Sequence, residues 1–368
     1  MGMGQRATPS LRPSVTNSAD GSTTVTYTHA TFTSAPGVAS LQMFGALFFS
    51  SYFFFWAWMV FGLYMMARCN VVSSTGALMI GAAYIANLFV SKPHKGSGWP
   101  FHWFLYGPTT DLVLGYHGAT CIREGPAPDP NGKYLFAMAP HGVFGVCRAF
   151  SGGRWLWRQI YPGIAARWGS FGAAFFIPGV REFSLCCGCL DASKSVLTRA
   201  IVERKENIIL LPGGEKEMML TDGSSKVTKL VLGERTGFVR LAITHGMSLV
   251  PGFCFGEKWV HESILLPKPV RAFLYKRFKV AGQLLRGRFY CTFLGHVVKA
   301  DGITPLTLGY AWGVPIDVRH EPNPSDEYVM EVHAKYIKAI EGLFERHKAR
   351  FGYDADETIE VVSAKKAA

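Results

Sequence analysis

Charged residues are scarce in this sequence. Only 17% of its 368 residues are Asp, Glu, Lys or Arg, against about 25% in an average soluble domain, while 49% are hydrophobic. So apolar a chain is not disordered, and a fully soluble enzyme is not expected. Acidic residues are the scarcer kind, 26 against 38 basic ones, so the formal net charge is +12. This excess favours anionic partners such as phospholipid headgroups or a phosphorylated cosubstrate, and we expect no nucleic acid partner.

Motifs of several large enzyme classes are also absent. The chain contains no G-x-S-x-G, no G-x-x-x-x-G-K-[ST], no G-x-G-x-x-G and no H-E-x-x-H. These patterns carry the nucleophilic serine of many hydrolases, the phosphate loop of nucleotide-binding enzymes, the dinucleotide site and the zinc site of many proteases. Serine hydrolases, lipases among them, are therefore disfavoured.

The eight cysteines form no regular framework, and a chain of this size does not need disulfide bonds to fold. We therefore expect reduced thiols that face the cytosol. Cys186 and Cys189 have the C-x-x-C spacing, but no second pair follows at zinc-ribbon distance, so we expect no metal site. Cys147 is a candidate nucleophile, although a free cysteine is more often a small buried apolar residue.

The first forty residues differ from the rest of the chain. They are rich in Ser and Thr, contain Asp20 as their single acid, and show no apolar period. We expect residues 1–40 to be a disordered tail that cannot bury a core. A Ser-rich, acid-poor segment with Arg6 and Arg12 is also typical of a transit peptide, which would place the protein in a plastid.

Two long uncharged runs follow, at residues 41–66 and 71–91. At about 1.5 Å per residue, each could cross a hydrocarbon core of about 30 Å as a helix. Buried helices of a soluble core are seldom apolar on all sides over this length. We therefore predict a transmembrane hairpin over residues 41–92, and the flanking basic residues favour both of its ends in the cytoplasm.

Strands and helices alternate over residues 93–368. Residues 134–139, 207–211 and 248–253 have the pattern of short buried strands, and the clearest amphipathic helix begins after Ser325. This alternation predicts one α/β domain around a largely parallel sheet. Within it, the stretch Lys258–Arg288 interleaves basic and aromatic residues, which suits either a membrane interface or a solvated basic face over an ordinary core helix.

Three predicted strands qualify for the edge where open parallel sheets bind ligands, and the third of them, residues 248–253, runs into Phe255, Gly256 and Glu257. Residues 134–139 run into His141, whose unperturbed pKa of about 6.5 suits a general base, although most histidines are satisfied polar groups of a fold. Residues 207–211 run into Gly213 and Gly214, with Glu217 after them as a candidate partner of His141; solvated acids in a turn are the alternative. We take Pro140, Gly142 and Phe144, with the two glycines, as candidate substrate-binding residues.

Three further polar residues precede the third predicted strand. Arg235, Arg240 and His245 could hold a phosphate or carbonyl oxygen of a substrate. Surface ion pairs are the alternative.

These blocks together resemble the type-2 diacylglycerol acyltransferase family, which includes monoacylglycerol and wax-ester acyltransferases. The most specific stretch is RTGFVRLAITHGMSLVPGFCFGE at residues 235–257, and the family's Pro-Gly-Gly-x-x-Glu block is met by Pro212, Gly213, Gly214 and Glu217. The resemblance spans residues 41–362. The family's His-Pro-His-Gly signature appears as Ala139, Pro140, His141 and Gly142, so only the second histidine is present.

The resemblance implies acyl transfer from acyl-CoA, as a cosubstrate, to the hydroxyl of diacylglycerol, with His141 as general base and with neither a metal nor a bound cofactor. It further implies a protein of the endoplasmic reticulum membrane or of lipid droplets whose catalytic domain faces the cytosol, with acyl-CoA, diacylglycerol and phospholipid as partners. Self-association into a homo-oligomer is compatible with it. Monoacylglycerol or a fatty alcohol are alternative acceptors. A lipid-binding membrane protein that has lost catalysis is the alternative from another class, because the first histidine is missing.

Overall fold

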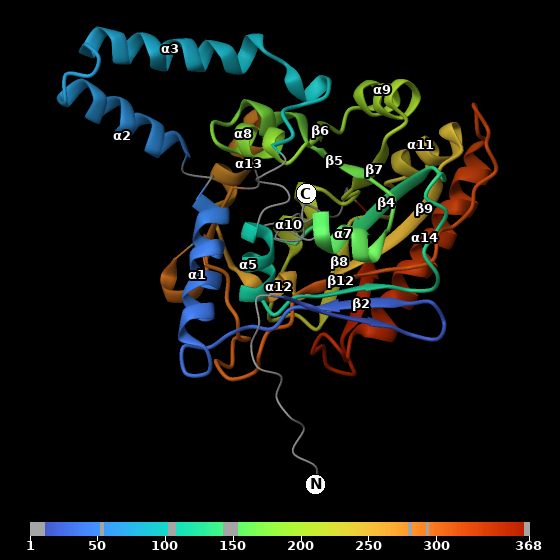
Figure 1. Ribbon diagram of the computed structural model, residues 1–368. Helices are drawn as coiled ribbons and strands as arrows, with labels where there is room; N and C mark the ends of the chain where they lie inside the picture. Colours follow the sequence, from blue (N-terminus) through green and yellow to red (C-terminus); the bar gives the residue numbers. More distant parts are fainter. Residues whose placement is uncertain are drawn as a thin grey trace.

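A large sheet runs through the molecule, with helices on both of its faces (Figure 1). The computed structural model describes residues 12–51, 55–101, 108–142, 154–278, 282–291 and 294–363. Every strand pairing from β9 (Ser248–Phe255) across the sheet to β6 (Leu190–Asp191) is parallel, which confirms the predicted α/β class with a largely parallel sheet. The strands in spatial order are β1 (Ser14–Asn17), β2 (Thr23–Thr26), β3 (Thr120–Arg123), β12 (Gly309–Trp312), β9 (Ser248–Phe255), β4 (Tyr134–Ala139), β7 (Asn207–Leu210), β5 (Ala166–Ser170) and β6 (Leu190–Asp191).

Strand β4 lies in the middle of the sheet, and all six of its side chains are buried. Alternate residues point to opposite faces of a strand, so both faces of β4 must be apolar. Leu135 and Ala137 face one core cluster with residues of α9 (Lys194–Arg204), α11 (Gly237–His245) and α14 (Asp326–His347). Tyr134 and Phe136 face another, with residues of α5 (Pro108–Tyr116) and α7 (Arg154–Ile160).

The predicted C-terminal helix is present as α14. The Ser325 side chain caps it by accepting a hydrogen bond from the Tyr328 N–H at 3.2 Å. The apolar stripe of α14 is buried against the sheet, as its period predicts. The remaining elements are η2 (Pro93–Lys95), η3 (Gly172–Phe176), α8 (Val180–Cys186), α10 (Glu215–Leu220), β8 (Val227–Leu230), α12 (Glu257–Val260), β10 (Glu262–Leu265), α13 (Lys268–Phe278), β11 (Gln283–Arg286), η4 (Arg288–Tyr290) and β13 (Thr358–Val361).

The prediction of a disordered tail over residues 1–40 is wrong for the part that the structure describes. β1 and β2 form an antiparallel hairpin that adds to the edge of β3. Val25 and Tyr27 are buried, and the Tyr27 hydroxyl donates to Asp111 at 2.7 Å. The Ser- and Thr-rich composition did not predict this hairpin, because Thr is β-branched and occurs in strands as well as in disordered tails.

The first predicted membrane run, residues 41–66, is divided between two helices. Helix α1 (Pro36–Ser50) packs against α5, and its buried Gln42 binds the main chain through the Ala30 N–H and the Thr28 carbonyl, both at 2.9 Å. Helix α2 (Phe55–Arg68) then projects from the body and turns back as α3 (Ser74–Val90) (Figure 1).

The projecting pair differs from the hairpin that the sequence predicts. The 14 residues of α2 span only about 21 Å. Among the described residues one helix, Ser74–Lys95, is long and apolar enough to cross a membrane. Tyr84 of α3 donates to Glu182 of α8 at 2.9 Å, which ties the projecting pair to the body. A transmembrane hairpin of two helices therefore stays a prediction.

Candidate active site at the carboxyl ends of β4 and β9

The sheet changes its winding direction beside β4. The chain leaves β4 for β5 and β7 on one side and later returns to β9 on the other side. Open α/β sheets bind ligands beyond the carboxyl ends of strands at such a switch point. His141 follows the end of β4, and Glu257 follows the end of β9 by two residues. Because β4 and β9 are parallel, both residues lie at this edge.

A buried carboxylate holds the segment that carries His141. Glu217 is 1% exposed, and one of its oxygens accepts the main-chain N–H of His141 at 2.7 Å. Its other oxygen accepts the N–H of Val231 at 2.9 Å. The carboxyl group packs directly on Gly213, where a Cβ would lie 1.9 Å from the Glu217 carboxyl carbon. A side chain at position 213 would therefore displace this carboxyl group from its two N–H donors.

This contact differs from the one expected from the sequence. We predicted that Glu217 orients the imidazole of His141 or stabilises its charged form. The structure brings the two residues together, but the hydrogen bond goes to the main chain of His141, whose ring Nδ1 lies 3.2 Å from the carbonyl oxygen of Gly142. Glu217 therefore positions the loop rather than the ring.

The environment of Glu217 shifts its protonation. Burial raises the pKa of Glu217 to about 7, while the N–H donors of His141 and Val231 and the charge of Arg235 act in the opposite direction. The predicted residue Arg235 thus lies near enough to act on this carboxylate. Gly214 directly precedes α10 and has φ 61° and ψ −155°, a conformation that favours glycine.

A second buried carboxylate lies on the other side of His141. Glu257 is 1% exposed, and a Cβ on Gly142 would lie 2.7 Å from its Oε2. Gly142 also has φ +68°, in the left-handed region, so both its conformation and its space require glycine. The sequence places Glu257 directly after the third predicted strand, but no motif there indicates a role for its carboxylate.

A cleft of about 840 Å³ opens beside these strand ends. Trp259 forms part of its wall, with the ammonium groups of Lys258 and Lys299 at 4.8 and 4.1 Å from its ring. Lys258 is paired with Glu357 in the interior, whereas Lys229 is exposed to solvent. A narrow space of about 20 Å³ shares Lys229 and Lys258 with the cleft and reaches Pro140 and Gly142.

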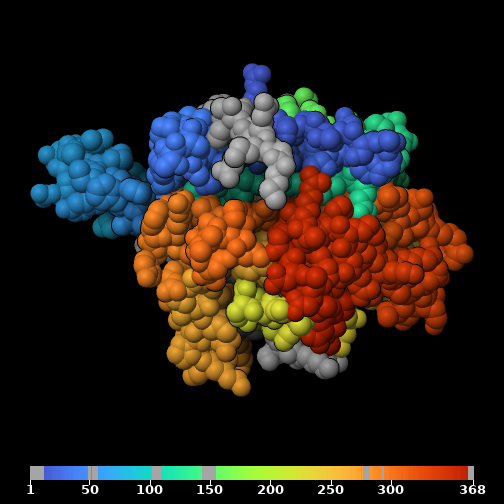
Figure 2. All heavy atoms as spheres, turned by 90° about the horizontal axis from the view of Figure 1, so that it is seen from below, coloured from blue at the N-terminus to red at the C-terminus, as the bar shows by residue number. Residues whose placement is uncertain are grey.

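The cleft is built by segments that lie far apart in the sequence. It is lined by the loop after α10, by α12 and β10, and by residues 296–302. In Figure 2 the yellow segment that follows α10 lies between orange segments and the red C-terminal part of the chain. No single motif marks this cleft, so the sequence did not reveal it.

Two predicted substrate-binding residues lie elsewhere. His245 directly precedes β9, so it lies at the opposite edge of the sheet from His141. Arg240 donates to the Pro324 carbonyl at 2.9 Å and pairs with Asp326, which joins α11 to the start of α14. Phe144 lies outside the described residues. Within the described ranges no three His, Cys, Asp or Glu side chains are placed to hold a metal ion.

The chain is similar to lipid acyltransferases. A family model described as "Diacylglycerol acyltransferase" matches residues 75–362. Acyl-CoA wax alcohol acyltransferase 1 of Homo sapiens is 29% identical over 281 residues, which cover 73% of this chain and 83% of that protein. 2-Acylglycerol O-acyltransferase 1 of Homo sapiens is 31% identical over 242 residues, which cover 63% of this chain and 70% of that protein.

One solved structure is also similar, the 1-acyl-sn-glycerophosphate acyltransferase PlsC of Thermotoga maritima. It is 16% identical, with 80% of this chain and 97% of that chain covered at a TM-score of 0.36.

The shifted pKa of Glu217 predicts a pH-dependent stability. The folded pKa of about 7 lies above the ordinary value of 4.5, so the folded protein holds the proton more tightly. The stabilisation is therefore complete below pH 4.5 and is lost as the pH rises through 7. Between pH 5 and pH 8 the free energy of unfolding should therefore fall by about 2 to 3 kcal/mol from this group.

Urea unfolding of detergent-solubilised protein, for wild type and Glu217→Gln, measures this loss. The free energy of unfolding should fall more steeply between pH 5 and 8 in the wild type than in Glu217→Gln. Glu331→Gln, at an exposed acid of α14, is the control and should follow the wild type. Parallel curves for wild type and Glu217→Gln would contradict the shifted pKa.

Proposed function

Because this chain belongs to the diacylglycerol acyltransferase family, we propose that it moves a fatty acyl group from acyl-CoA to the free hydroxyl of diacylglycerol and so makes triacylglycerol. The observation that carries the proposal is the placement of His141 at the switch point of the sheet, with its main chain held by the buried Glu217. The relatives include proteins named for wax alcohols and for 2-acylglycerol, so a fatty alcohol or a monoacylglycerol is the second candidate acceptor.

In the proposed reaction the His141 imidazole removes the proton of the acceptor hydroxyl. The oxygen then attacks the thioester carbonyl carbon, a new C–O ester bond forms, and the C–S bond breaks. The coenzyme leaves as a thiolate and takes the proton back from the imidazolium, which restores the base. The buried carboxylate of Glu257, packed on the neighbouring Gly142, would stabilise the transient positive charge. The reaction as written uses no metal and no tightly bound cofactor.

The cleft beside the strand ends suits the charged part of the coenzyme. Lys229 and Lys299 could bind its phosphates, and Trp259 offers an aromatic wall. The narrow space that reaches Pro140 and Gly142 leads from the cleft toward His141. At about 20 Å³ it would have to widen before the thioester could pass.

The acceptor and the product are nearly insoluble, so the site must be supplied from a membrane. The pair of helices α2 and α3 supports a hairpin that enters the bilayer, because α3 is long and apolar enough to span it. We place this hairpin in the endoplasmic reticulum membrane, with the catalytic part on the cytosolic side and access to lipid droplets.

Purified protein with one labelled acyl-CoA should acylate diacylglycerol faster than monoacylglycerol or a fatty alcohol. Thin-layer separation of the labelled products measures the preference. Wax ester as the main product would move the assignment to the second candidate. Lipid binding without any acylated product would indicate a protein that has lost catalysis.

His141→Ala should lose activity about 10²- to 10⁴-fold, because a positioned general base contributes that much to the rate. Initial rates at saturating acyl-CoA measure the loss. His320→Ala, which removes an exposed imidazole hydrogen-bonded to the Thr244 carbonyl, is the control and should keep the wild-type rate. Wild-type turnover by folded His141→Ala would defeat the mechanism.

Lys229→Ala should raise the KM for acyl-CoA roughly tenfold with little change in kcat, because about 1.4 kcal/mol of phosphate binding is lost. Lys335→Ala is the matched control, since Lys335 lies on α14 away from the cleft and pairs with Glu331. An unchanged KM in Lys229→Ala would exclude this lysine from coenzyme binding.

A further inference from the structure

The chain concentrates its positive charge in one short segment. Residues 262–291 contain seven Lys or Arg residues and a single acid, Glu262, so this twelfth of the chain carries half of the net charge of +12. For the overlapping stretch Lys258–Arg288 the sequence left two interpretations open, a membrane interface or a basic face over an ordinary core helix. The burial of α13, which lies in the middle of this segment, distinguishes between them.

Helix α13 does not cover a core. None of its described side chains is buried, and Phe273 is 62% exposed. A helix of 11 residues is marginal in water unless an apolar face packs against something. The neighbouring hairpin of β10 and β11 forms a two-stranded sheet of its own, which is also marginal without a partner surface.

Exposed apolar side chains accompany the basic ones throughout this segment. Phe289 and Tyr290 of η4 are 71% and 82% exposed. The guanidinium of Arg288 lies 4.8 Å from the Phe289 ring, and that of Arg286 lies 5.3 Å from the Tyr290 ring. Aromatic rings beside basic groups are typical of membrane–water interfaces. Further exposed apolar residues of the segment are Ile264, Leu265, Val270 and Leu284.

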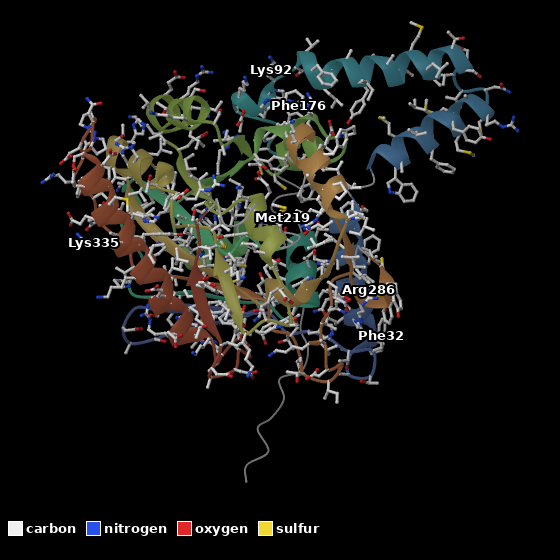
Figure 3. The ribbon with its side chains drawn as sticks, turned by 180° about the vertical axis from the view of Figure 1, so that it is seen from behind. Phe32, Lys92, Phe176, Met219, Arg286 and Lys335 are labelled. Atoms are coloured by element: carbon white, nitrogen blue, oxygen red, sulfur yellow. The ribbon has the colours of Figure 1, made fainter. Side chains whose placement is uncertain are left out.

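This segment is continuous with α1. Cys291 and Leu294 pack with Ala46 and Leu47 of α1 in one apolar cluster. The opposite face of α1 exposes further apolar side chains, with the rings of Phe44 and Phe48 stacked at 6.2 Å. Figure 3 shows α13, β11 at Arg286 and α1 along the side from which α2 and α3 project, whereas Lys335 lies on the far side.

We propose that residues 262–278 and 282–291, together with the outer face of α1, form a second membrane-contact surface, which docks on anionic phospholipid beside the α2–α3 hairpin. The inference rests on the proposed membrane location of that hairpin. Basic residues are attracted to an anionic membrane surface, and exposed aromatic rings enter its headgroup region. An anionic lipid surface would neutralise the basic side chains of this segment and cover its exposed apolar ones.

The surface adjoins the cleft assigned to the coenzyme. Glu262 and Leu265 of β10 belong to the segment and also line the cleft. Docking would therefore hold the mouth of the cleft at the level of the lipid headgroups. There, one molecule of acyl-CoA can keep its acyl chain in the bilayer and its phosphorylated part in water.

The test uses the full chain in vesicles that contain a phospholipid with a photoreactive diazirine near its headgroup. Crosslinked peptides are mapped by mass spectrometry in phosphatidylcholine alone and with added phosphatidylserine. Peptides within 262–291 should be labelled, and more strongly with phosphatidylserine, whereas α14 peptides should stay at background. The double variant Lys268→Glu/Lys276→Glu should reduce the labelling of 262–291 at least about threefold. The labelling of the α2–α3 hairpin peptides and the melting temperature of the protein should not change in this double variant.

The control Lys335→Glu/Lys338→Glu places the same charge change on α14 and should leave all labelling unchanged. Labelling of the hairpin with only background in 262–291 would overturn the proposed surface and leave the membrane location of the hairpin standing. Background in both segments would overturn the surface and the membrane location together. Equal labelling with and without phosphatidylserine would overturn the role of anionic lipid.

Discussion

The candidate site depends on one buried carboxylate. Glu217 connects the loop after β4 with the segment after β8 through two main-chain N–H groups, at 2.7 and 2.9 Å. Apart from these bonds its carboxyl group lies in the interior, where an unpaired charge would be costly. The Glu217 carboxyl group occupies the space that a side chain at position 213 would need. His141 lies at the edge of the sheet because it follows the end of β4, and the buried Glu217 holds its main chain there.

Ala139 occupies the position of the first histidine of the family signature. Ala139 is fully buried at the end of β4, in register with Phe253 of β9, within the core cluster that α11 and α14 cover. An imidazole at that position would have to be accommodated among apolar side chains. His141 lies two residues further along, half-buried and beyond the sheet. One imidazole is enough for the reaction as proposed, because the same ring removes the proton and returns it.

Sequence patterns predicted what depends on neighbouring residues. The fully buried β4, the capped helix α14 and the turn between α2 and α3 each follow from local periodicity or a local break in it. The approach of His141 and Glu217 was predictable in outline, since β4 and β7 are parallel neighbours. The hydrogen-bond donor that Glu217 binds was not predictable, because a carboxylate can accept from a main-chain N–H or from an imidazole ring equally well. Only the packing of the folded chain determines which of the two lies within reach.

The remaining errors share a physical cause, which is that composition does not say what a segment packs against. Helix α1 is as apolar as a membrane span, yet Gln42 anchors it by filling the space above Gly115 of α5 and binding the preceding loop. The β1–β2 hairpin is polar in composition, yet it places Val25 and Tyr27 in the core. The same reasoning applies in reverse to residues 262–291. Phe273, Phe289 and Tyr290 of this segment stay exposed, and no described part of the chain covers them. The excess of basic residues around them favours an anionic partner.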